Sequence, residues 1–137
     1  MARFLYSFLL LTLLNVAQAQ DIKVVYHVNT GVESAATALS NIQNHLNADP
    51  KVKIVVVTHG SGIDFLLQDT KDSKGREFSS SVGDLSGKGV EFRVCNNTLV
   101  SRNINPDKLL METALVPSGV AEVARLQARE GFVYIKP

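Results

Sequence analysis

The feature that most constrains the fold is the apolar run at residues 52–58, which has the sequence VKIVVVT. Ile54, Val55, Val56 and Val57 follow one another without a polar side chain between them. A strand of this kind has no face to present to solvent, so it is typical of the centre of a parallel sheet that is covered on both sides. Parallel strands need long crossover connections, which are usually helices. Strands and helices should therefore alternate along this chain.

The rest of the sequence shows this alternation. Further strands are predicted at residues 22–28, 90–95, 115–116 and 132–135, and helices at residues 33–47, 63–68, 78–86, 97–102 and 117–128. The periodicity of the last helix places Val120, Val123, Ala124, Leu126 and Gln127 on its inner face. We therefore expect a three-layer α/β/α domain with a mainly parallel sheet of four or five strands.

The first 19 residues have the three parts of a secretory signal peptide. Arg3 is a positively charged start, residues 4–14 are almost unbrokenly apolar, and Ala17-Gln18-Ala19 is an A-x-A cleavage site. The apolar run is shorter than the about 20 residues that span a bilayer. We expect cleavage after Ala19, a single domain over residues 20–137, and a periplasmic or secreted protein without membrane contact after cleavage. An uncleaved N-terminal anchor is the alternative.

Charge and histidine spacing argue against several classes of partner and cofactor. The chain has 14 Lys and Arg against 13 Asp and Glu, and the two become equal when Arg3 leaves with the leader. This balance gives no electrostatic basis for binding nucleic acid. His27, His45 and His59 lack metal-ligand spacing and there is one cysteine, so neither a metal nor another cofactor is expected. His27 is interpreted as a core or interface residue and His45 as a solvated one.

Polar residues follow three of the predicted strands at the point where each strand ends. The three endings are Asn29-Thr30-Gly31, Thr58-His59-Gly60-Ser61-Gly62 and Cys95-Asn96-Asn97-Thr98. The carboxyl ends of parallel strands meet at one edge of a sheet, where ligands bind, and free N–H groups of the following helices point there. The sequence therefore predicts a binding rim made by Asn29, Thr30, His59, Gly60, Ser61, Asn96 and Asn97.

Cys95 is the only cysteine, so it cannot form an internal disulfide. A thiol before a helix N-terminus has a pKa below the about 8.5 of a free cysteine, and a protonated His59 nearby would lower that pKa further. In one interpretation Cys95 is a nucleophile or carries sulfur. In another it is a small buried residue at a strand end, and in a third it links two chains. The residues alone leave these alternatives open.

Four segments together resemble the DsrE/DsrF-like family, in particular its small secreted members. They are KVVYHVNTG, VVVTHGSGIDFLL, GVEFRVCNNTL and VPSGVAEVARLQAREGFVYIKP. The resemblance covers residues 22–137, which is nearly the whole mature chain. The resemblance implies a parallel α/β fold and homo-oligomers, commonly trimers or hexamers. Better-understood relatives pass persulfide sulfur along a relay through a cysteine at a strand end, and Cys95 is the residue that could take this part.

Two functions are therefore expected. The first is a carrier or transferase of sulfane sulfur, rather than a hydrolase or oxidoreductase, which uses Cys95 and exchanges sulfur with a donor or acceptor protein. The alternative is a non-catalytic oligomeric module that binds a small anion, a metabolite or a partner protein at the same rim. In that case Cys95 is structural.

Overall fold

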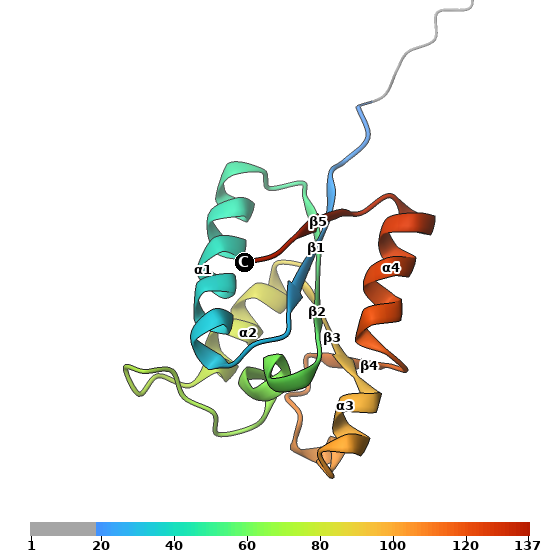
Figure 1. The fold of residues 1–137 in the computed structure, drawn as a ribbon. Helices are drawn as coiled ribbons and strands as arrows, with labels where there is room; N and C mark the ends of the chain where they lie inside the picture. The colour runs from blue at the N-terminus through green and yellow to red at the C-terminus, as the bar shows by residue number, and fades with distance from the viewer. Residues whose placement is uncertain (1–18) are drawn as a thin grey trace, which may run out of the picture.

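Five parallel strands form one sheet in the computed structural model, which describes residues 19–137 (Figure 1). They are β1 (Lys23–Val28), β2 (Lys53–Thr58), β3 (Glu91–Cys95), β4 (Thr113–Val116) and β5 (Val133–Ile135), arranged in the order β4-β3-β2-β1-β5. Every pairing between neighbours is parallel. The predicted parallel sheet is confirmed, with five strands. The predicted signal peptide lies outside the described residues, apart from Ala19 at its end.

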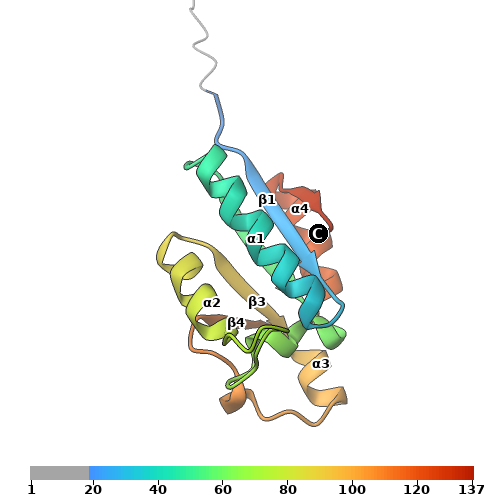
Figure 2. The same ribbon diagram turned by 90° about the vertical axis from the view of Figure 1, so that its left-hand side faces the viewer.

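Helices lie on both faces of the sheet (Figures 1 and 2). They are α1 (Val32–Ala48), α2 (Phe78–Gly87), α3 (Asn96–Ser101) and α4 (Gly119–Glu130), with two 3-10 helices, η1 (Gly60–Leu66) and η2 (Pro106–Lys108). α1 and α2 cover one face, and α4 covers the other (Figure 1). Across residues 19–137, none of these helices combines the length and apolar character needed to cross a bilayer.

The strand β2 has apolar side chains on both faces, as its sequence predicts. Ile54 and Val56 belong to the larger part of the core, under α1, η1 and α2, where the Phe65 ring packs edge-on against two other phenylalanine rings. Val55 and Val57 point the other way. They pack with Val25, Val123, Leu126 and Phe132 in a smaller cluster under α4. The sheet is therefore buried between two unequal apolar layers.

Several side chains lie elsewhere than the sequence predicts. Val120 is 64% exposed, and Ala124 and Gln127 are exposed as well. The buried face of α4 consists of Gly119, Glu122, Val123 and Leu126. The prediction for Val120 was wrong because Glu122 is buried by pairing with Arg93 of β3, which periodicity of apolar residues cannot reveal. His45 is not simply solvated, since its Nδ1 lies 3.0 Å from the Tyr26 hydroxyl.

One glycine allows the chain to turn tightly against the end of β1. A Cβ atom on Gly62, in η1, would lie 2.2 Å from the carbonyl oxygen of Val28. Real Cβ atoms do not approach backbone atoms this closely. Gly60, two residues earlier, has a φ of +57°, which is the left-handed conformation that glycine favours. The turn after β2 therefore depends on glycine at both positions.

The ion pairs of Glu122 fasten α4 to the sheet. This carboxylate pairs with Arg93 and also accepts two hydrogen bonds of 2.8 Å from Arg125. The bonds from Arg125 and Arg93 outweigh burial and lower the pKa of Glu122 to about 2. Because this pKa is lower in the folded state, the stabilisation is complete above the unfolded pKa of about 4.3 and is lost as the pH falls toward 2.

We expect Glu122→Gln to lower the free energy of unfolding at pH 7 by about 2 kcal/mol, since charge-assisted hydrogen bonds are lost. The variant should also lose less stability than the wild type between pH 5 and pH 2. Urea denaturation across this pH range measures both effects, with the exposed Glu33→Gln as the matched control. Equal pH dependence in Glu122→Gln and the wild type would contradict the assignment.

Candidate functional site

Cys95 lies where two helices begin. It is the last residue of β3, and α3 starts directly after it at Asn96. On the neighbouring strand it pairs with Val116, and that strand leads through Pro117 and Ser118 into α4. The Cys95 side chain is 5% exposed. The thiol is therefore enclosed by the starts of α3 and α4 at the carboxyl edge of the sheet.

The surroundings of the thiol favour its ionised form. Burial raises the pKa of Cys95, but hydrogen bonding from the Gly119 N–H, from the Thr98 hydroxyl and N–H and from the Asn97 N–H lowers it. The second effect is the larger, so the pKa lies below the ordinary value of a cysteine thiol. These donors belong to the first turns of α3 and α4, where N–H groups have no partner within the helix. Together they favour a thiolate at Cys95, and the Asn97 N–H also donates a hydrogen bond of 3.3 Å to the carbonyl oxygen of Pro117.

The start of α4 lies tightly against the ends of β2 and β3. A Cβ on Gly119 would be 3.2 Å from the Cβ of His59 and 3.3 Å from the Cβ of Cys95. Cys95 and His59 are therefore neighbours on either side of Gly119. The hydroxyl of Thr98 accepts a hydrogen bond of 3.0 Å from the N–H of Gly60, which ties the turn after β2 to the donors around the thiol.

The imidazole of His59 joins a second polar group on the same side of the sheet. Its Nε2 lies 2.7 Å from Nε2 of His27 in β1, and Nδ1 of His27 lies 2.8 Å from the Tyr134 hydroxyl in β5. Burial, followed by the nearby His59 and Lys136, lowers the pKa of His27 to about 4. Burial and Lys136 also lower the pKa of His59. Both imidazoles are therefore neutral near pH 7.

The predicted rim residues do not all take part in these networks. Gly60 and Asn97 contribute N–H groups, and Asn29 accepts a hydrogen bond from Lys136. The side chains of Thr30, Ser61 and Asn96 make no hydrogen bond to another residue within the described range 19–137. Five residues that the prediction omitted belong to the two networks. They are His27, Thr98, Gly119, Tyr134 and Lys136.

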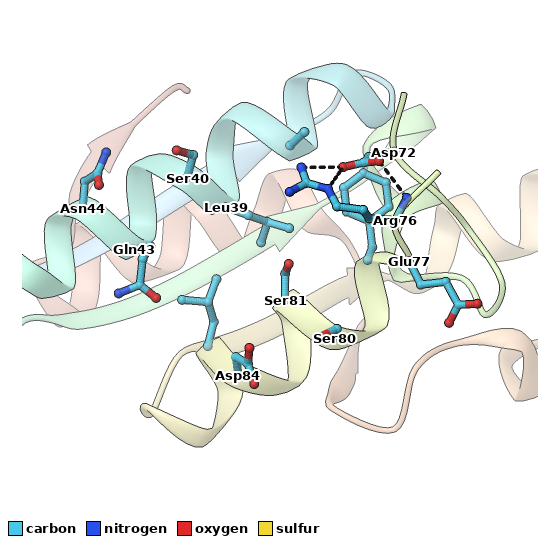
Figure 3. Close-up of a pocket in the computed structure, with 13 residues that line it drawn as sticks. Leu39, Ser40, Gln43, Asn44, Asp72, Arg76, Glu77, Ser80, Ser81 and Asp84 are labelled. Carbon is cyan, nitrogen blue, oxygen red and sulfur yellow. Dashed lines mark hydrogen bonds and ion pairs between the residues drawn. The ribbon is translucent and has the colours of Figure 1, made fainter. Parts of the chain in front are cut away.

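One pocket of the domain lies away from Cys95 (Figure 3). It is a groove of about 510 Å³ between α1 and α2, lined by polar side chains such as Gln43 and Ser81 and closed at one end by the Asp72–Arg76 ion pair. Residues 19–137 hold no cluster of three or more His, Cys, Asp and Glu side chains placed to bind a metal ion. No cysteine or histidine lines this groove, whereas Cys95, His27 and His59 lie at the carboxyl edge of the sheet.

Comparisons with known proteins agree with this architecture. A model of the DsrE/DsrF-like family matches residues 6–137. A protein of unknown function, MTH1491 from Methanobacterium thermoautotrophicum, has a similar structure at 35% identity and a TM-score of 0.77, with 85% of this chain and 100% of that chain covered. The ychN protein from E. coli shares the fold at 14% identity and a TM-score of 0.71, with 85% and 99% covered. No curated protein matches the chain.

Proposed function

This chain belongs to the DsrE/DsrF-like family, which is associated with sulfur relay, and on that premise we propose that Cys95 carries sulfane sulfur as a persulfide. The observation that carries the proposal is the set of N–H and hydroxyl donors from Asn97, Thr98 and Gly119, which lowers the pKa of the thiol. The thiolate is the reactive form of cysteine in such exchange reactions.

The transfer is an exchange between sulfur atoms without net oxidation. The Cys95 thiolate attacks the outer sulfur of a donor persulfide, R–S–SH. A new S–S bond forms on Cys95, the S–S bond to R breaks, and RS⁻ leaves with the electron pair. In the second half an acceptor thiolate attacks the outer sulfur on Cys95, and the Cys95 thiolate leaves. The donors that stabilise this thiolate make it a better leaving group.

Intact-mass spectrometry of the native protein tests this proposal. After incubation with glutathione persulfide, the wild type should gain the mass of one sulfur atom and lose it again on reduction. Cys95 should also react with iodoacetamide near neutral pH faster than an ordinary cysteine does, because its lowered pKa favours the reactive thiolate. A native protein that gains no sulfur, and whose Cys95 resists iodoacetamide until denatured, would rule the proposal out.

The hydroxyl of Thr98 offers a finer test of the thiolate environment. Thr98→Val keeps the shape of the side chain but removes the hydroxyl, so the pKa of Cys95 should rise. We expect alkylation by iodoacetamide at pH 7 to slow about fivefold or more, as for the loss of a hydrogen bond to a charged group. The pH profile of the alkylation rate measures this change.

Ser101→Ala is the matched control for Thr98→Val. Ser101 lies in the same helix, and its hydroxyl donates to the carbonyl oxygen of Thr98 without taking part at the thiol. Its alkylation profile should equal that of the wild type. A Thr98→Val profile that superimposes on the wild-type curve would contradict the role assigned to the hydroxyl.

We also propose that the mature protein is secreted or periplasmic and forms a homo-oligomer, through which it exchanges sulfur with a donor or acceptor protein. The leader-like residues 1–19 support export. Exposed apolar side chains, Val120 on α4 and Leu115 on the edge strand β4, are surface that a second copy would cover. N-terminal sequencing and light scattering of the exported protein test these two proposals separately.

A further inference from the structure

Three polar side chains beside the thiol form a hydrogen-bonded series, His59–His27–Tyr134. This series is not needed to stabilise the Cys95 thiolate. His27, His59 and Tyr134 come from the carboxyl ends of β1, β2 and β5, which are separate in sequence and adjacent in the sheet. The groups that lower the pKa of Cys95 are N–H donors and the Thr98 hydroxyl instead. The three side chains are therefore available for another task.

The geometry of the His59–His27–Tyr134 series permits a proton to pass from one side chain to the next. The two imidazoles meet nitrogen to nitrogen at 2.7 Å, with ring centroids 4.8 Å apart and ring planes inclined by 30°. A neutral imidazole has one N–H donor and one acceptor nitrogen, so a single proton lies between the two Nε2 atoms. If each ring changes to its other tautomer, a proton taken up at one end of the His59–His27–Tyr134 series is released at the other.

The two ends of the His59–His27–Tyr134 series are suitably placed for proton exchange. The Nδ1 atom of His59 forms no hydrogen bond with another of residues 19–137, and the Cβ atoms of His59 and Cys95 both lie against Gly119. The other end is Tyr134, which is 40% exposed and can exchange its hydroxyl proton with water. Lys136 is the charged group that acts on both imidazoles, and it favours their neutral forms.

We propose that His59 exchanges a proton at Nδ1 with the donor or acceptor thiol during sulfur transfer at Cys95, and that His27 and Tyr134 are positioning residues that connect His59 to solvent. The proposal rests on the sulfur-carrying function of Cys95. During loading, RS⁻ takes the proton from His59 Nδ1. The His59–His27–Tyr134 series then regains a proton from water through Tyr134. During unloading, the acceptor thiol gives its proton to Nδ1, and a proton leaves through Tyr134 to water.

The test compares Tyr134→Phe and His27→Asn with the wild type in transfer of sulfur from loaded Cys95 to free cysteine, followed by intact mass. Both variants should transfer sulfur about 10- to 100-fold more slowly near pH 7, since general acid–base groups contribute at least this much. Their pH profiles should change as well. The rate of Cys95 alkylation should stay at its wild-type value, because the thiolate is stabilised by other groups.

Tyr26→Phe is the matched control. Tyr26 lies in β1, as His27 does, and its hydroxyl forms a hydrogen bond with His45, a histidine that is not part of the His59–His27–Tyr134 series. It should transfer sulfur like the wild type. His59→Ala should be slow and should be rescued by added imidazole, which a merely structural role would not allow. Wild-type rates and pH profiles in Tyr134→Phe and His27→Asn, with normal loading, would overturn the relay alone. A wild type that never loads sulfur would overturn the proposed function and the relay together.

Discussion

Replacing Cys95 by serine should abolish uptake of sulfur from a persulfide donor, because no other thiol exists in the chain. Serine is close in size to cysteine, and its hydroxyl can still accept hydrogen bonds from the N–H groups of Asn97 and Gly119. The free energy of unfolding should therefore change by no more than about 1–2 kcal/mol. Intact-mass spectrometry after incubation with glutathione persulfide, beside urea denaturation, measures both quantities on the same preparations.

Measuring sulfur uptake and the free energy of unfolding together distinguishes the loss of a reactive group from the loss of folded protein. Loss of uptake with retained stability assigns the sulfur to Cys95 and not to an adduct elsewhere. Uptake that persists in Cys95→Ser would contradict the assignment. A wild type that takes up no sulfur, together with a Cys95→Ala variant of nearly unchanged stability, would favour the non-catalytic binding module instead.

Replacing Gly62 by alanine should cause the largest loss of stability of any substitution considered for this protein. The new Cβ would lie 2.2 Å from the Val28 carbonyl oxygen, 2.5 Å from its carbon and 2.6 Å from Cα of Asn29. All three are backbone atoms at the end of β1, so no side chain can rotate away. We expect a loss of about 3 kcal/mol or more in the free energy of unfolding, as in overpacked sites that force backbone shifts.

Gly87→Ala is the matched control, because a Cβ at Gly87, the last residue of α2, meets no atom within 4 Å. This control should keep or slightly raise the stability, since alanine restricts the unfolded chain more than glycine does. Guanidinium denaturation of both variants gives the comparison. Equal midpoints for Gly62→Ala and Gly87→Ala would show that the turn after β2 adjusts more easily than its close contacts indicate.

The elements of the fold follow from the sequence because local patterns encode them. The unbroken apolar run at Ile54–Val57 specifies a strand that is covered twice, and β2 has this environment. The left-handed Gly131 ends α4 where the sequence predicts a helix stop. Such signals involve residues within one turn or one strand. Val120 was placed wrongly because the buried carboxylate beside it, Glu122, has a partner on another strand.

The candidate site could be predicted only in part, for the same physical reason. Cys95 and His59 are found as polar residues at strand ends, because that position is encoded locally. His27 and Tyr134 become neighbours only through the strand order β2-β1-β5, which the sequence does not reveal. One hint was present, since His27 follows Val25 by two residues and so shares its face of the sheet. Nothing in the sequence shows that Gly119 would approach both Cys95 and His59.

The position of β5 has a consequence for how this molecule is made. The last strand of the chain pairs with the first, and the contact between Tyr134 and His27 joins residues 107 positions apart. Contacts this distant form late, because a long loop must close before they can exist. During synthesis the outer edge of β1 stays unpaired until β5 has been made and has emerged from the ribosome. A nascent chain that has not yet reached β5, or one truncated before it, already holds the thiol but lacks the tyrosine–histidine contact.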